Sequence, residues 1–108
     1  MGAAAIAEQS GERWWDAEIS RLRGLVALSR GQLGGSNAWL LKSLQTARQQ
    51  RAKSLELRAA TSLARFWRDQ GKRTEARDLL APVYGWFTEG FDTLDLKDAK
   101  ALLDDLAS

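Results

Sequence analysis

The 108-residue sequence predicts an all-α protein, and three observations support this prediction. It contains a single proline, so almost nothing in it forbids a helix. Many of its residues are alanine, leucine, arginine, glutamine and glutamate, which lose little rotamer freedom in a helix. Apolar residues recur every three or four positions, in segments that glycines end. At this length we expect one domain, covering residues 1–108, with one modest core.

The first two predicted helices occupy the N-terminal half of the chain. The first runs from about Ser10, its expected N-cap, to about Arg30, and Gly31 ends it. Its large apolar residues share one helical face, which we expect to point into the core: Trp15, Ile19, Leu22 and Val26. A glycine-rich turn leads to a second helix, which Ser36 is expected to cap and which ends near Gln50. Its expected inward residues are Leu40, Leu41, Leu44 and Ala47.

Three more helices are predicted after a short polar break. Ser54, Thr74 and Thr93 are their expected N-caps, and Gly71 and Gly90 are expected to end the first two of them. The residues that we expect to face the core are Leu55, Ala59, Leu63 and Trp67, then Ala76, Leu80, Val83 and Phe87, and finally Ala99, Leu102, Leu103 and Leu106.

A weak internal repeat becomes visible when the sequence is shifted by 40 positions. Small residues then fall on small ones and apolar residues on apolar ones, as Gly24 on Ala64, Gly31 on Gly71, Ser36 on Ala76, and Leu40 on Leu80. This spacing is typical of tetratricopeptide hairpins, in which small residues let two helices approach closely. The sequence therefore predicts an α-solenoid fragment of two antiparallel hairpins of tetratricopeptide type, at about 10–50 and 54–90. A capping helix is predicted at about 93–107.

Five segments also resemble a known family: residues 11–18, 21–24, 54–60, 65–73 and 76–93. They are similar to the tetratricopeptide-repeat-like C-terminal region of bacterial adenylate/guanylate cyclase-like proteins and of predicted-ATPase regulatory proteins. In those signalling regulators a cyclase and an ATPase module precede the repeats. Neither module is present in this sequence, so the resemblance implies a protein-interaction segment and transfers no catalytic residue.

The composition excludes several kinds of functional site. There is no histidine and no cysteine, which removes the usual general base, a thiolate nucleophile, a disulfide and a zinc-thiolate centre. The glycine-rich turn at residues 31–36 lacks the lysine and the spacing of a phosphate-binding loop. Asp95, Asp98, Asp104 and Asp105 belong to a predicted helix instead of a metal-binding loop. We therefore predict no catalytic residue, no cofactor, no metal site and no enzymatic activity.

The net charge of +2 conceals an uneven distribution. Residues 1–41 carry four basic and four acidic side chains, residues 42–77 carry ten and three, and residues 78–108 carry two and seven. A basic middle segment therefore precedes an acidic end. The two segments are able to attract each other within one chain or between chains.

A partner-binding groove is predicted along the first helix of each hairpin, which lines the concave side of such repeats. The predicted groove residues are Glu18, Arg21, Leu25, Leu28, Arg58, Thr61, Arg65 and Arg68. Arginines there suit an acidic protein or peptide segment. Two other interpretations stay open: the arginines form a solvated face or pair with the acidic end, or they bind nucleic acid. Nucleic-acid binding by the basic middle segment is the alternative function.

The tryptophans divide into two groups. Trp15 and Trp67 fall on the predicted inward faces and are expected in the core. Trp14, Trp39 and Trp86 fall off those faces and are candidate interface residues. Since repeat arrays need their ends covered, we expect self-association, with a dimer as the simplest form. The sequence has no basic leader and no apolar run long enough to span a bilayer, so we expect a cytoplasmic protein with no membrane partner.

Overall fold

A computed structural model describes the backbone of residues 2–107 and the side chains of residues 15–107. Over this range the chain forms five α-helices and no strand. They are α1 (Gly2–Ser29), α2 (Leu33–Gln49), α3 (Lys53–Asp69), α4 (Arg73–Gly85) and α5 (Leu94–Leu106). The predicted all-α class is therefore confirmed.

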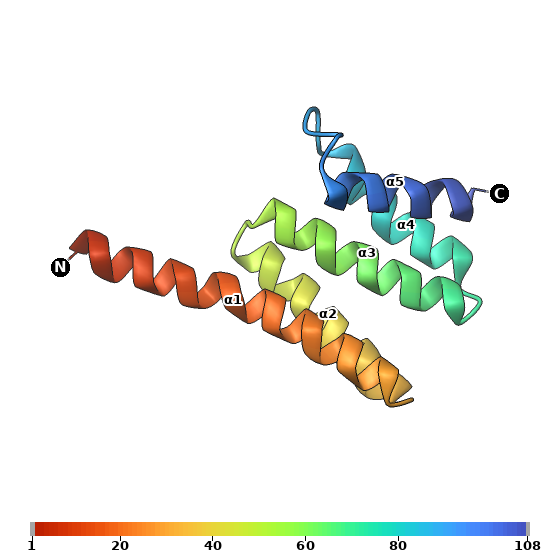
Figure 1. Ribbon diagram of the computed structural model, residues 1–108, viewed down its shortest axis with the longest axis horizontal. Helices are drawn as coiled ribbons and strands as arrows, with labels where there is room; N and C mark the ends of the chain where they lie inside the picture. Colours follow the sequence, from red (N-terminus) through yellow and green to blue (C-terminus); the bar gives the residue numbers. More distant parts are fainter. Residues whose placement is uncertain (1, 108) are drawn as a thin grey trace.

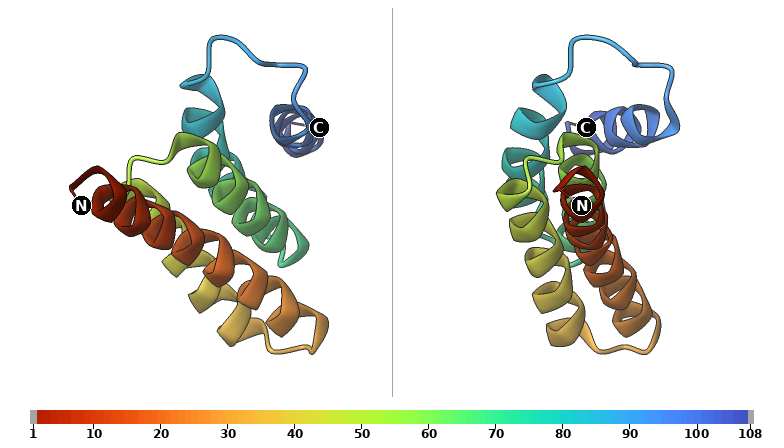
Figure 2. Two further views of the ribbon diagram at one scale, coloured as in Figure 1. Left: turned by 60° about the vertical axis from the view of Figure 1, so that its left-hand side comes forward. Right: turned by 90° about the vertical axis from the view of Figure 1, so that its left-hand side faces the viewer.

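The helices are arranged in two layers (Figure 1, Figure 2). One layer holds α1, α3 and α5, and the other holds α2 and α4. Helices α1 and α2 form one antiparallel hairpin, and α3 and α4 form a second. Helix α2 packs on α3 and thereby joins the hairpins, while α5 packs on both α3 and α4. The first turns of α1 extend beyond the end of α2 (Figure 1).

Three turns of the same geometry connect the first four helices. One residue in each turn has a positive φ: Gly31 at 74°, Arg51 at 55° and Gly71 at 81°. The next residue donates its backbone N–H to a carbonyl five positions earlier, as Gln32 to Ala27 at 2.9 Å, Ala52 to Ala47 at 3.0 Å, and Lys72 to Trp67 at 2.8 Å. This is the Schellman arrangement, which satisfies the last carbonyls of a helix. The following helix begins directly after it, at Leu33, Lys53 or Arg73.

These turns explain why most of the expected N-caps were wrong. Ser36, Ser54 and Thr74 lie inside their helices, because the Schellman turn already sets where the next helix begins. The residues in the cap positions of α2, α3 and α4 make no side-chain capping bond. Ser10 also lies inside a helix, since α1 begins at Gly2.

The last turn of the chain was predicted in part. Helix α4 ends at Gly85 and not near Gly90 as expected. Gly90 instead has a φ of 77° in the loop that leads to α5. Thr93 directly precedes α5, as predicted, although its side chain makes no capping hydrogen bond.

The main core lies between α2, α3, α4 and α5, and it confirms most of the expected inward residues. Its fully buried members include Leu40 and Leu80, which the 40-residue shift makes equivalent. The equivalent small residues Ser36 and Ala76 are fully buried as well. Trp67 is partly buried against this core, as expected for a core tryptophan. At these two pairs of positions in α2 and α4, the repeat seen in the sequence relates residues of equal burial.

Helix α1 reverses the expected orientation. Its buried residues are mainly small: Ala17, Ser20, Gly24 and Ala27. The four large residues expected in the core are exposed, with exposed fractions of 56% for Trp15, 44% for Ile19, 48% for Leu22 and 49% for Val26. We call these four residues the outer face of α1. The prediction that they point into the core was wrong.

Close packing of α1 on α2 is the reason for this reversal. A Cβ atom at Gly24 would lie 2.8 Å from Cγ of Leu40, which is too close for any side chain without movement. About two turns earlier in α1, the carbonyl oxygen of Ala17 accepts a hydrogen bond from the hydroxyl of Ser43 at 2.7 Å. Only small residues fit between helices at this distance, so the large ones occupy the opposite side of α1.

Arg51 provides a test of the turn geometry. A left-handed conformation costs a residue with a Cβ about 1–2 kcal/mol relative to glycine. Arg51→Gly should therefore raise the free energy of unfolding by about 1 kcal/mol, while Gly71→Arg should lower it by about 1 kcal/mol. Urea denaturation monitored by circular dichroism measures both. A loss of stability in Arg51→Gly would show that the turn at Arg51 is not strained.

Candidate functional site

A polar groove of about 240 Å³ lies between α1, α3 and α5. Its lining residues are Arg21, Arg58, Thr61, Ser62, Arg65, Asp95 and Asp98. Four of the eight predicted groove residues are among them, namely Arg21, Arg58, Thr61 and Arg65. The structure thus brings half of the predicted set to one place. We refer to this site as the polar groove.

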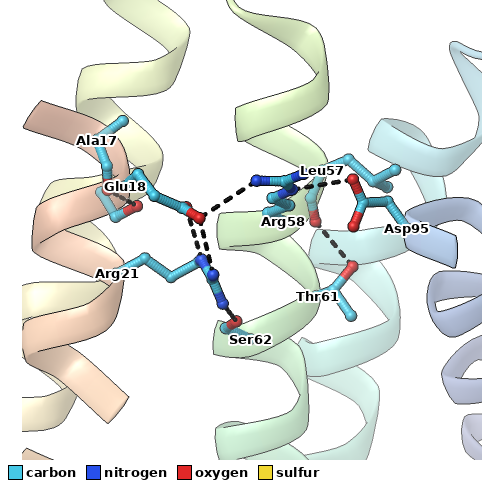
Figure 3. Close-up of polar contacts among 9 residues, drawn as sticks. Ala17, Glu18, Arg21, Leu57, Arg58, Thr61, Ser62 and Asp95 are labelled. Carbon is cyan, nitrogen blue, oxygen red and sulfur yellow. Dashed lines mark hydrogen bonds and ion pairs between the residues drawn. The ribbon is translucent and has the colours of Figure 1, made fainter. Parts of the chain in front are cut away.

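Glu18 is the centre of an ion-pair network that includes Arg21 and Arg58 of the polar groove (Figure 3). Its carboxylate accepts hydrogen bonds from Nε and Nη2 of Arg21, at 2.8 and 2.9 Å, and from Nη1 of Arg58 at 3.2 Å. Arg58 also donates from Nε to Asp95 at 2.9 Å. These contacts connect α1 to α3 and α3 to α5. The network therefore holds three helices of one layer in a fixed relation.

The network shifts the pKa of two of its members. The hydrogen bond from Arg21 is the main cause that lowers the pKa of the Glu18 carboxyl below its usual value, against the opposing effect of burial. The hydrogen bond to Asp95 is the main cause that raises the pKa of Arg58. Both shifts favour the charged forms, so the ion pairs persist at neutral pH.

The charges of the polar groove largely cancel each other. Arg58 is paired with Glu18 and Asp95, and Arg68 is paired with Asp69 and with Asp105. Pairing of the basic middle segment with the acidic end of the same chain is therefore confirmed for these two arginines. Within residues 15–107, Arg65 is exposed and forms no ion pair. It is the one arginine of the predicted set whose charge is open to solvent.

The predicted groove residues outside the network around Glu18 have different surroundings. Thr61 is buried and donates its hydroxyl to the carbonyl oxygen of Leu57 at 2.7 Å. Leu28 packs against the main core. Leu25 is 36% exposed, and neither Leu25 nor Arg68 lines the polar groove. The predicted groove is thus a smaller polar site than the sequence implied.

A second surface was missed by the sequence analysis. Beside the outer face of α1, a shallow groove of about 360 Å³ is lined by Ile19, Leu22, Arg23, Val26, Ala27, Arg30, Gln32 and Trp39. Trp39 is half-buried there, with Cζ of Arg23 5.0 Å and Nζ of Lys42 5.2 Å from its ring centre. The run of small residues at Ala17, Ser20, Gly24 and Ala27 was the signal that could have revealed it. That run marks the inward side of α1 and so places the large residues outside.

A second candidate interface tryptophan, Trp86, does not join this surface. Trp86 is 57% exposed after the end of α4, where its ring meets Phe87 edge-on at 5.1 Å and Nζ of Lys53 at 5.0 Å. The side chain of Trp14 lies outside the described residues. Of the two whose side chains are described, Trp39 adjoins the outer face of α1 and Trp86 does not.

Comparisons with known proteins give no family or function. No protein-family model matches the chain, and neither a curated protein nor a solved structure shows significant similarity to it. In the part of the chain that the structure describes, no cluster of three or more acidic side chains could hold a metal ion. Within the same part, no helix has the length and apolar character needed to cross a bilayer.

Glu18→Gln tests the ion-pair network. We expect it to lower the free energy of unfolding by about 1 kcal/mol at neutral pH, because Arg21 and Arg58 lose a charged acceptor. The folded-state pKa of Glu18 is lowered, so its contribution is present above the unfolded value near 4.5 and is lost as the pH falls further. The difference in the free energy of unfolding between the wild type and the variant should therefore disappear below pH 4.5. Urea denaturation of both proteins at several pH values measures this difference.

The matched control for this prediction is Glu89→Gln. Glu89 is exposed in the loop after α4 and forms no ion pair among residues 15–107. This variant should have the stability of the wild type at every pH. An equal loss in both variants would contradict a specific role for Glu18.

Proposed function

We propose that this chain is a non-catalytic protein-interaction module of tetratricopeptide type, and that it binds its partner through the outer face of α1. The proposal carries forward the resemblance to the repeat tail of bacterial cyclase-like regulators. The observation that supports it is a difference in burial between equivalent positions of the two hairpins.

Equivalent positions of the two hairpins differ sharply in burial. The 40-residue shift places Trp15 on Leu55, Ile19 on Ala59, Leu22 on Ser62, and Val26 on Phe66. In α3 these positions are at most 7% exposed, whereas in α1 each is at least 44% exposed. Helix α3 is covered because α2 packs on it. Among the described residues, no helix covers α1 in the same way.

The apolar character of α1 supports the same proposal. A helix with apolar residues on two opposite sides is typical of a buried helix. Large exposed apolar patches on soluble proteins mark interaction sites. Terminal repeats of a helical array need a polar outer side or a neighbour. The outer face of α1 is not polar, so it needs a neighbouring helix.

The arrangement of the helices supports the tetratricopeptide part of the proposal. The first helices of the two hairpins lie next to each other, and the second helix of hairpin one packs on the first helix of hairpin two. Their small residues, Gly24 and Ala64, are both buried. Stacked hairpins with close contacts at small residues are the basis of such arrays.

The nucleic-acid alternative receives less support from the structure. It relied on Arg58, Arg65 and Arg68 as a cationic surface. Two of these three arginines are held in ion pairs by aspartates of α5. Phosphate contacts need arginines whose charge is available.

Site-specific photocrosslinking tests the proposed function. Benzoylphenylalanine at position 22, in place of Leu22, should give covalent adducts with a protein when cells that produce the chain are irradiated. An adduct with a second copy counts as well as one with another protein. The matched control carries the same residue in place of Arg77, which is exposed on α4 and should give no adduct. Equal yields at the two positions would overturn the proposal.

A further inference from the structure

We infer that the outer face of α1 docks on the same face of a second copy of this chain, with the two α1 helices antiparallel about a two-fold axis. The inference rests on the proposed function and identifies the partner. Its support comes from the spacing of the apolar residues, the charges beside them and the character of the opposite end of the molecule.

The spacing of the outer face reads the same in both directions. Its residues are separated by four, three and four positions, which is the spacing of a coiled-coil seam. In an antiparallel pair, Trp15 then lies opposite Val26 of the partner subunit. Ile19 lies opposite Leu22 of the partner subunit. Each of these pairs then occurs twice, as an isologous contact of one patch with itself requires.

Two charges at one edge of the outer face favour the antiparallel arrangement. Asp16 and Arg23 are seven residues apart, so they lie on the same side of α1. Within residues 15–107 neither forms an ion pair, although Arg23 lies over the ring of Trp39. In the antiparallel dimer, Asp16 of each chain meets Arg23 of the partner subunit. A parallel pair would place this edge of the two helices on opposite sides of the seam, so Asp16 and Arg23 of different chains would not meet.

The exposed side of α5 favours a contact between two α1 helices over a head-to-tail contact. Helix α5 covers α3 and α4, and its exposed side from Lys97 onward is polar, with Lys97, Lys100 and Asp104 exposed. The exposed apolar residues Phe91 and Leu94 lie before this polar side. The polar side is a poor match for the outer face of another chain, whereas a contact between two copies of the outer face covers the apolar residues of both chains.

Sedimentation equilibrium with a matched pair of variants tests the dimer. The wild-type chain should show a concentration-dependent monomer–dimer equilibrium. Leu22→Glu buries a charge in the apolar seam and should raise the dimer Kd by about 30-fold or more. Gln45→Glu adds the same charge at an exposed position of α2 and should leave the Kd unchanged. Because Leu22 is half-exposed in one chain, both variants should keep the helical circular dichroism of the wild type.

A charge exchange tests the antiparallel register. Asp16→Arg and Arg23→Asp should each raise the dimer Kd, because each places like charges together at two symmetric sites. The double variant restores opposite charges at both sites and should regain the affinity of the wild type. Single variants that bind as tightly as the wild type would overturn the antiparallel arrangement.

The outcomes separate this inference from the proposed function. A wild-type chain that stays monomeric at all concentrations, or a dimer that Leu22→Glu does not weaken, overturns the homodimer. If position 22 still crosslinks to a different protein, the proposed function stands with another partner. If position 22 crosslinks to nothing and the chain is monomeric, both proposals fail.

Discussion

The contact between Gly24 of α1 and Leu40 of α2 decides how the whole N-terminal hairpin is arranged. Because a Cβ atom at Gly24 would lie 2.8 Å from Leu40, the two helices pack at a distance that only small side chains allow. This fixes the rotation of α1 about its own axis. The same rotation directs Glu18 toward the arginines of α1 and α3 and turns the large apolar residues outward. The ion-pair network and the exposed outer face are thus two results of one steric constraint.

The sequence was sufficient to predict the all-α class and the inward faces of most helices, because large apolar side chains do the packing there. It failed for α1, where large residues lie on one side and small residues on the other. The periodicity of large apolar residues predicted that the side with Trp15 and Ile19 faces the core. The short distance between α1 and α2 instead requires the side with Gly24 to face inward. The N-caps failed for a related reason: Schellman hydrogen bonds, and not side-chain caps, set where α2, α3 and α4 begin.

The polar groove could be predicted only in part. Arg21, Arg58 and Arg65 were placed together correctly, because they lie on corresponding faces of α1 and α3. Their pairing with carboxylates could not be assigned in detail, because Asp95 comes from a third helix that only the tertiary arrangement brings to the groove. A charge count showed that the basic and acidic segments attract each other. It did not show which residues meet.

The three shared turns have a consequence for how this molecule changes its length in evolution. Because α2 and α4 begin 40 positions apart after turns of the same geometry, duplication of one whole hairpin preserves the orientation of every helix face. An insertion within a helix does not preserve these orientations, because each added residue rotates all later side chains of that helix by about 100°. Length variation is therefore expected in steps of complete hairpins. Such a step leaves the packing of the existing core unchanged.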